Sequence, residues 1–340
     1  MNTTVKSFIG IDVSKPYFDA SLLSEINHEK QNIKTERFSN SSDGIKSFGK
    51  WLKDHYVSFN ENTLIVIENT GIYHRLLWSF CTKKKLTLHI GNAAHIKWSF
   101  GIARGKNDTI DSIRLCNYAY KHCDDLKASP ALNPVLLKLK DLMTSRTKLL
   151  TQVTAIKVYI KELSNVSDKD VQKLLMKAHK NAIEGLTASI KNIETELRKI
   201  VAENEAVKKN YDLLRTVPGI GHLTSIYIIC CTDNFAGKIS GKQLACYAGV
   251  VPFEHSSGIS IKGRNRVHSM ANKTLKKMLH LSAMTAIQKY EEFKIYYTRK
   301  KAEGKHGMSV MNAIRNKIIL RAVAVVNNQK PYVNKMEMVG

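Results

Sequence analysis

The sequence predicts an α/β domain followed by a mainly helical remainder, with two long helices between them. Three patterns support this: short β-branched runs alternate with helix-like segments in the first third, heptad spacing occupies the middle, and helix-turn patterns dominate the rest. The chain has 340 residues and 43% hydrophobic content, which is enough for two or three domains with cores of their own. We predict domains at residues 1–125, 126–210 and 211–340.

The first domain alternates between strand-like and helix-like segments. KSFIGIDVS and YFDASLL predict two strands joined by a turn at Lys15–Pro16, and TERFSN predicts a third. Ser41, Ser42 and Asp43 signal a helix start, and ENTLIVIENT predicts a buried strand because it is short, β-branched and continuously apolar. GIYHRLLWSFCTKK predicts a helix, LTLHIG a strand and NDTIDSIRLCNYAYKH a further helix. This alternation predicts a central mixed sheet with helices packed on it.

The middle of the chain has the spacing of coiled-coil helices. Apolar residues recur at alternating intervals of three and four, and Arg146 fills the one gap. The two stripes comprise Val135, Leu139, Leu142, Leu149, Val153, Ile156, Ile160 and Leu163, and then Ile183, Leu186, Ile190, Ile193, Leu197 and Ile200. They predict two long helices, interrupted around SNVSDKD, that pack either as a hairpin within one chain or as a contact between copies.

The last third is predicted to be mainly helical. LLRTVPGIGHLTSIYIICC has the pattern of a helix-hairpin-helix, in which Gly219 and Gly221 permit a tight turn and the next helix offers amide donors to a phosphate. An ordinary helical turn is the alternative. Beyond it we expect a helix, then a polar loop with three cations that could contact a nucleic-acid backbone, and then a further helix. These cations are Lys262, Arg264 and Arg266.

The charge of the chain indicates a polyanionic partner. The 53 Lys and Arg residues exceed the 29 Asp and Glu residues, which gives a formal net charge of +24. Because the cations are spread along the chain, we expect several folded surfaces to contact nucleic acid or, less often, an anionic membrane. Lys15, Arg104 and Lys106 lie near candidate site residues in the sequence and could bind phosphate, although a solvated surface explains each of them slightly better.

Cysteine usage and hydropathy indicate a cytoplasmic protein with no membrane partner. The six cysteines include no CxxC pair, so we expect reduced thiols and no zinc site. The N-terminal segment MNTTVKSFIG lacks a signal-peptide pattern, and the longest apolar stretch, SIYIICC, is too short to span a bilayer.

Four acids stand out in this basic chain. Asp12 interrupts an apolar strand, Glu68 ends another, and Asp108 and Asp111 lie on one face of a helix. Taken singly, Asp12 and Glu68 are explained as well by a salt bridge or a cap, and the pair Asp108 and Asp111 is most often a solvated face or a first-turn cap. Together they match a ribonuclease-H-like sheet, in which such positions converge on one edge and hold two Mg²⁺ ions roughly 4 Å apart. Asp19, on the second strand, is predicted to be structural.

Four motifs resemble those of one known family. GIDVSK, VIENTGIY, KNDTID and AGVVPFEHSSGISIKGR occur in the order of the DEDD transposases and site-specific DNA invertases of bacterial insertion sequences, the Piv/MooV type. The resemblance covers nearly the whole chain, and the four motifs are specific only in combination. It implies a RuvC-like N-terminal domain, a coiled coil and a C-terminal transposase domain. It also implies that the four catalytic acids are Asp12, Glu68, Asp108 and Asp111.

The resemblance further implies a serine nucleophile and a guide RNA. The serine of the Ser-Gly motif maps onto Ser257, directly before Gly258, and Ser256 is the alternative because the serine is doubled. The nucleophile would hold one broken DNA end as a phosphoserine ester. A structured RNA from the element would guide the choice of double-stranded DNA at the element ends and the target, and such a bacterial protein would lie at the nucleoid when bound to DNA. We also expect a homo-oligomer, either a dimer or a tetramer.

Three functions remain as hypotheses at this point. The first is a transposase or recombinase that uses metal and serine. The second is a RuvC-like, metal-dependent nuclease that hydrolyses junctions without serine chemistry. The third is a nonenzymatic nucleic-acid-binding protein, against which the presence of all four acids argues. A covalent protein–DNA adduct distinguishes the first from the second.

Overall fold

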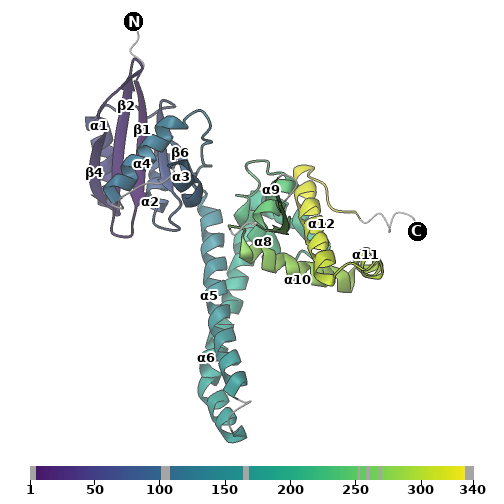
Figure 1. Ribbon diagram of the computed structural model, residues 1–340. Coiled ribbons are helices and arrows are strands. Elements are labelled where there is room, and N and C mark those ends of the chain that lie inside the picture. Colours follow the sequence, from purple (N-terminus) through teal and green to yellow (C-terminus); the bar gives the residue numbers. More distant parts are fainter. Residues whose placement is uncertain are drawn as a thin grey trace. The chain divides into compact units, whose positions relative to one another are not determined.

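The computed structural model describes residues 5–100, 108–163, 168–251, 253–257, 261–267 and 270–333 (Figure 1). For residues 253–257 and 261–266 it describes the backbone only. The chain forms two compact units, Met1–Leu132 and Asn133–Gly340. The first is an α/β unit, whereas the second contains the long helices and the mainly helical remainder. The division into three domains stays a prediction.

A mixed sheet forms the centre of the first unit, as the sequence predicted. β1 pairs with β2 in an antiparallel hairpin and with β5 in parallel, and β6 extends the parallel side. The antiparallel side is completed by β3 and β4, which both pair with β2. The strands are β1 (Val5–Val13), β2 (Tyr17–Ile26), β3 (Glu29–Lys30), β4 (Lys34–Ser39), β5 (Thr63–Glu68) and β6 (Thr87–Gly91).

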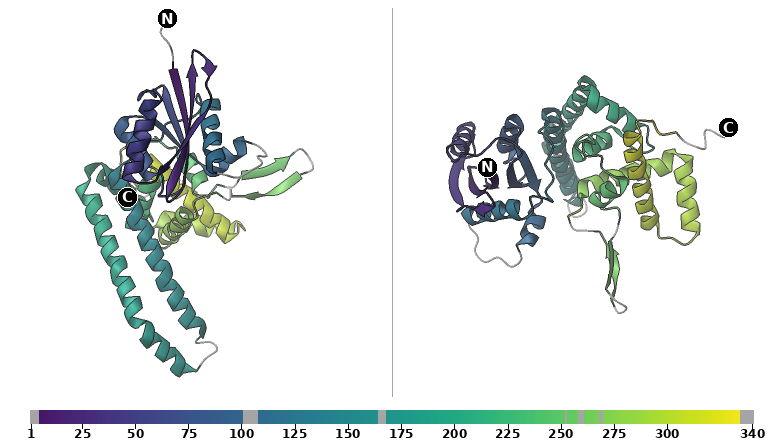
Figure 2. Two further views of the ribbon diagram at one scale, coloured as in Figure 1. Left: turned by 90° about the vertical axis from the view of Figure 1, so that its left-hand side faces the viewer. Right: turned by 90° about the horizontal axis from the view of Figure 1, so that it is seen from above.

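The two faces of this sheet are covered by different helices (Figure 2). Successive side chains of a strand point to opposite faces, so Ile9 and Ile11 of β1 pack with α1 and α2, while Phe8 packs with α4. Gly10 allows α4 to approach closely, because a Cβ there would clash with the backbone nitrogen of Cys116. The helices are α1 (Ser42–Asp54), α2 (Arg75–Lys84), α3 (Ala93–Ser99) and α4 (Asp108–Lys121).

Local signals set the helix starts of the first unit. The side chain of Ser41 accepts a hydrogen bond from the Gly44 amide at 3.2 Å, which confirms the predicted start of α1. The helix expected from residue 71 begins only at Arg75, so that prediction was four residues too long. Gly71 has a φ of +78°, which is incompatible with a right-handed helix.

The heptad stripes of the second unit form the contact between α5 (Pro134–Leu163) and α6 (Lys169–Glu203), which lie side by side as a hairpin within one chain (Figures 1 and 2). Leu139, Val153 and Leu197 are among the buried stripe residues. In the gap of the stripe, Nε of Arg146 donates a hydrogen bond to Oε1 of Glu194 at 2.7 Å. A contact between copies of the chain stays a prediction.

The remainder of the second unit is mainly helical but contains one β-hairpin. The expected polar loop was wrong in part, because β7 and β8 pair in an antiparallel ladder. Polar composition suggested a loop, yet a two-stranded ladder needs only backbone donors and acceptors in register. The elements are α7 (Glu205–Arg215), α8 (His222–Cys231), α9 (Gly241–Tyr247), β7 (Phe253–Ser257), β8 (Ile261–Arg266), α10 (Lys273–Lys289), α11 (Glu291–Ala302) and α12 (Gly307–Asn327).

The free cysteines agree with the expectation of reduced thiols. All six cysteines are free, and burial raises the pKa of the Cys81, Cys116 and Cys230 thiols to about 12, so these thiols stay protonated. Within the described parts of the chain, no helix has both the length and the hydrophobicity needed to cross a bilayer.

Candidate active site

Three segments of the first unit bring the four predicted acids to one face of the sheet. Asp12 lies on β1, Glu68 is the last residue of β5, and Asp108 and Asp111 lie in the first turn of α4. β1 and β5 run in parallel with Ile11 opposite Ile67. The next residues of the two strands are Asp12 and Glu68, so these two acids also lie beside each other on neighbouring strands. Both side chains therefore point to the face that α4 covers.

The packing of α4 places its first turn over this face. The close approach at Gly10 fixes the height of the helix above β1. The hydroxyl groups of Ser21 and Ser112, both buried, share a hydrogen bond of 2.8 Å that ties α4 to β2. Since Ser112 follows Asp111 directly, this bond anchors the acidic turn to the sheet.

The four carboxylates repel one another. Burial raises the pKa of Asp12 to about 6, and the negative charges of Asp108, Asp111 and Glu68 contribute to that rise. Burial also raises the pKa of Glu68, with a further contribution from Asp111. The fold thus concentrates negative charge at one place in a basic chain, which is an arrangement that a bound cation would stabilise.

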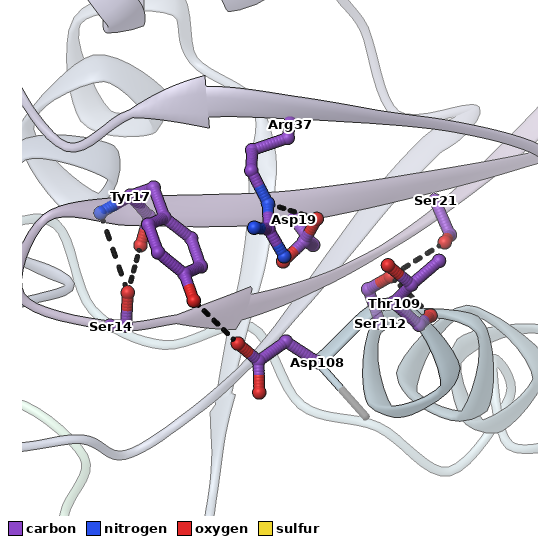
Figure 3. A network of polar contacts seen from close by, with 8 residues as sticks. All are labelled: Ser14, Tyr17, Asp19, Ser21, Arg37, Asp108, Thr109 and Ser112. Atoms are coloured by element: carbon purple, nitrogen blue, oxygen red, sulfur yellow. Dashed lines mark hydrogen bonds and ion pairs between the residues drawn. The ribbon is translucent and has the colours of Figure 1, made fainter. Parts of the chain in front are cut away.

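A network of polar contacts holds Asp108 from the side of β2 and β4 (Figure 3). Oη of Tyr17 donates a hydrogen bond to Oδ2 of Asp108 at 2.9 Å. The guanidinium of Arg37 lies 3.9 Å from the centre of the Tyr17 ring and donates two hydrogen bonds to Asp19, at 3.0 and 2.9 Å. Asp19 is 2% exposed and paired, in agreement with the structural role predicted for it.

The donor set of the acidic cluster fits a hard divalent cation. Carboxylate oxygens are the ligands that Mg²⁺ prefers, and a cation would offset the burial and the mutual repulsion that raise the pKa of Asp12. Among the described residues, no group of three His, Cys, Asp or Glu side chains is close enough to hold a metal ion in the present arrangement. Binding therefore requires the acid side chains to draw together. One oxygen of Asp111 is already engaged by Nη1 of Arg114, at 2.8 Å.

The predicted serine nucleophile lies in the second unit. Ser257 ends β7 opposite Ile261, and Ser256 pairs with Lys262 of β8. Arg264 and Arg266 belong to the same strand. Three residues named in the sequence predictions lie outside the described residues: Arg104, Lys106 and Gly258.

The segment predicted as a helix-hairpin-helix forms two helices, α7 and α8, joined by a turn. Gly219 has a φ of +84° and packs so closely on the Ser282 carbonyl that a Cβ would clash with it, so this position requires glycine. Gly221 is the N-cap of α8 and has an ordinary φ of −89°. The contact of this turn with phosphate stays a prediction.

Two family models match the chain on either side of the α6 region. One, described as a transposase, matches residues 9–164, which include the four acids. The other, described as the transposase IS116/IS110/IS902 family, matches residues 211–298, which include Ser257.

Curated proteins agree with these matches. The chain is 26% identical over 337 residues to the pilin gene-inverting proteins of Moraxella bovis and Moraxella lacunata, covering 96% of this chain and 98% of each relative. It is 25% identical over 188 residues to the transposase for insertion sequence element IS1111A of Coxiella burnetii, covering 44% of this chain and 50% of that protein. Both regions of the chain therefore match families of transposases, and the C-terminal region matches the IS116/IS110/IS902 family.

Proposed function

We propose that this chain is an insertion-sequence recombinase that cuts and rejoins DNA with Mg²⁺ held by Asp12, Glu68, Asp108 and Asp111. The observation that carries this proposal is the convergence of four carboxylates, from three separate segments, on the α4-covered face of one sheet. The order of the sheet, with an antiparallel hairpin flanked by parallel strands, also supports a RuvC-like fold. The net charge of +24 suits a DNA substrate.

The four acids would bind the cation, and neighbouring side chains orient two of them. Asp12 and Glu68 would supply carboxylate oxygens to the cation from the adjacent parallel strands β1 and β5. Asp108 is oriented by Tyr17, and Asp111 by Arg114. When bound, Mg²⁺ would supply charge stabilisation to the attacking and leaving oxygens of a phosphodiester.

We further propose that Ser257 is the nucleophile. Its Oγ would form a bond to phosphorus while a bond from phosphorus to a deoxyribose oxygen breaks. The serine loses one proton and the leaving oxygen gains one, so one ester replaces another and the strand can be rejoined without an energy source. The match of residues 211–298 to a transposase family supports this function over a RuvC-like nuclease without serine chemistry, which would need the first unit alone.

The proposal is tested by recombination of a plasmid that carries the DNA flanking the gene of this chain. The protein is used with its co-purifying nucleic acid, and the reaction is run in Mg²⁺, in EDTA, or in Mg²⁺ after ribonuclease treatment. We expect recombination only in the first reaction, because both the metal and a guide RNA are required. Equal recombination in EDTA would contradict the metal role, and survival after ribonuclease treatment would contradict RNA guidance.

Tyr17→Phe is expected to weaken binding of a divalent cation by about 10- to 100-fold, because it removes a hydrogen bond that orients a ligand carboxylate. The measurement is a Mn²⁺ titration followed by electron paramagnetic resonance, which does not depend on catalysis. Tyr56→Phe is the matched control, since Tyr56 belongs to the same unit and is 89% exposed. Equal Mn²⁺ affinity in both variants would show that Tyr17 does not position Asp108.

A further inference from the structure

A cavity of about 450 Å³ lies in the second unit, where α5 and α6 meet the turn before α8 and the helix α10. Three cations and one acid are among the residues that line it. These are Arg146, Arg198, Lys277 and Glu194. At neutral pH this charged part of the lining carries a surplus of positive charge, so an anion is the expected ligand.

Arg146 is the residue that interrupts the apolar stripe of α5. Its side chain is 18% exposed and its partner Glu194 is 25% exposed, and their hydrogen bond of 2.7 Å crosses from α5 to α6. An apolar residue at this position would pack between the helices without the free-energy cost of desolvating two charges. The charge at a packing position therefore indicates a use for Arg146 beyond the contact between the two helices.

The first turn of α8 opens into the same cavity. Gly221, its N-cap, and His222, its first residue, both line the space. No side chain caps this end of the helix, and a Cβ at Gly221 would approach only Nη1 of Arg215, at 3.9 Å. Backbone amides at a helix start carry a partial positive charge and donate hydrogen bonds to anions.

His222 adds a buried ring nitrogen to this end of the helix. Its Nδ1 shares a hydrogen bond of 2.8 Å with Oη of Tyr211, whereas its Nε2 is buried and has no hydrogen-bond partner among the described residues. Burial, with the charges of Arg198 and Arg215, lowers the pKa of this histidine, so the ring is neutral near pH 7. If Tyr211 donates to Nδ1, the ring proton lies on Nε2, where it can bond to an anionic oxygen.

We propose that this cavity, which we call the α8 cavity, binds a phosphodiester group of a nucleic-acid strand. The inference rests on the proposed function, in that nucleic acid is the partner of the chain. Arg146, Arg198 and Lys277 supply charge, and the start of α8 with Nε2 of His222 supplies uncharged donors. The apolar side chains of Met278 and Leu281, which also line the cavity, suit the sugar of the same nucleotide.

The test compares two double variants that remove the same charge. Arg198→Gln with Lys277→Gln changes α6 and α10 inside the cavity, whereas Lys199→Gln with Lys273→Gln changes the same two helices at residues outside its lining. Affinity is measured by fluorescence anisotropy against salt concentration, with RNA, single-stranded DNA and duplex DNA of one sequence as probes. Thermal unfolding checks that each variant is folded.

We expect the cavity variant to weaken binding about five- to eightfold for each cation lost at roughly 0.1 M salt, and to lower the salt slope by about 0.7 to 0.9 per contact. The probe that shows this loss identifies the strand that occupies the cavity. Equal affinity and slope in the two double variants would overturn the inference and leave the proposed function standing. A failure of the unaltered protein to bind any probe would instead count against the proposed function.

Discussion

Asp12→Asn is expected to abolish DNA recombination and, at the same time, to stabilise the metal-free protein. The carboxylate would help to hold Mg²⁺, which supplies several kcal/mol of charge stabilisation to the transition state. Its loss corresponds to a rate reduction of roughly 10³-fold or more. Asparagine has nearly the same shape but no charge, so the fold should persist.

The gain in stability follows from the raised pKa of Asp12. In the unfolded chain this carboxyl ionises near its ordinary pKa of 3.8, whereas in the fold its pKa is about 6. Below pH 3.8 the group is protonated in both states. As pH rises from there to about 6, the unfolded chain releases a proton that the fold retains, so the free energy of unfolding falls. Above about pH 6 this decrease in the free energy of unfolding is complete and stays constant.

Asp12→Asn removes this deficit. The shift corresponds to about 3 kcal/mol, which we reduce to about 1–2 kcal/mol because Asp12 is partly exposed and its charge is partly screened by solvent. The measurement is the thermal midpoint of the metal-free protein and the variant between pH 4 and 8. We expect the variant to unfold at the higher temperature above pH 6 and the two midpoints to converge near pH 4.

Asp19→Asn is the control, because Asp19 lies directly opposite Asp12 in the β1–β2 ladder. Here the charge is paired with Arg37, so its removal should destabilise the fold by about 1–3 kcal/mol. If Asp12→Asn and Asp19→Asn lowered the thermal midpoint by the same amount, Asp12 would be a structural residue like Asp19. The proposed metal site would then lose its main support.

Ser257→Ala is expected to abolish strand exchange by roughly 10⁴-fold or more while leaving binding of Mn²⁺ and DNA unchanged. Alanine lacks the oxygen that would form the bond to phosphorus, and no other group can replace a covalent nucleophile in place. The measurement is the yield of recombined plasmid per unit time, with DNA affinity measured in parallel.

Ser256→Ala is the matched control, since it removes the same group from the adjacent residue of β7. We expect recombination within a few-fold of the unaltered rate. The reverse pattern, with activity lost in Ser256→Ala and kept in Ser257→Ala, would move the nucleophile by one residue. Recombination at the unaltered rate in both variants would contradict the role of Ser257 as the required nucleophile.

The sheet and the convergence of the acids could be predicted from the sequence because both depend on local signals. β-branched runs mark the strands, and carboxylates at the ends of parallel strands meet at one edge for geometric reasons. Asp12 and Glu68 needed only the assignment of two strands. The two long helices α5 and α6 were also predictable from local signals, because their apolar residues recur at intervals of three and four along the sequence.

The hydrogen bonds that hold the acids in place could not be predicted, because they form between segments that are distant in the sequence. Tyr17 and Asp108 are separated by 91 positions, and their hydrogen bond exists only when α4 is placed over β2. Arg37 meets Asp19 because the β2–β4 register sets them opposite each other, which no motif specifies. The one signal available in the sequence was that β4 carries a cation, Arg37, that could pair with the buried acid Asp19 of the neighbouring strand.

The β7–β8 hairpin was missed for a different reason. Its strands are rich in polar and charged residues, and the strand signals of alternating apolar residues are weak there. The partnerless ring nitrogen of His222 was equally invisible, since only the packing of α7 and α8 shows that Tyr211 occupies one nitrogen and leaves the other buried.

Capture of a covalent protein–DNA adduct tests the joint role of the acids and the serine most directly. The Mg²⁺-dependent reaction is stopped with detergent, and the protein is digested and mapped by mass spectrometry. We expect a nucleotide linked to the peptide that contains Ser257, and no such adduct in Asp12→Asn or Ser257→Ala. Cleaved DNA with free ends and no adduct in the unaltered protein would contradict the proposed recombinase.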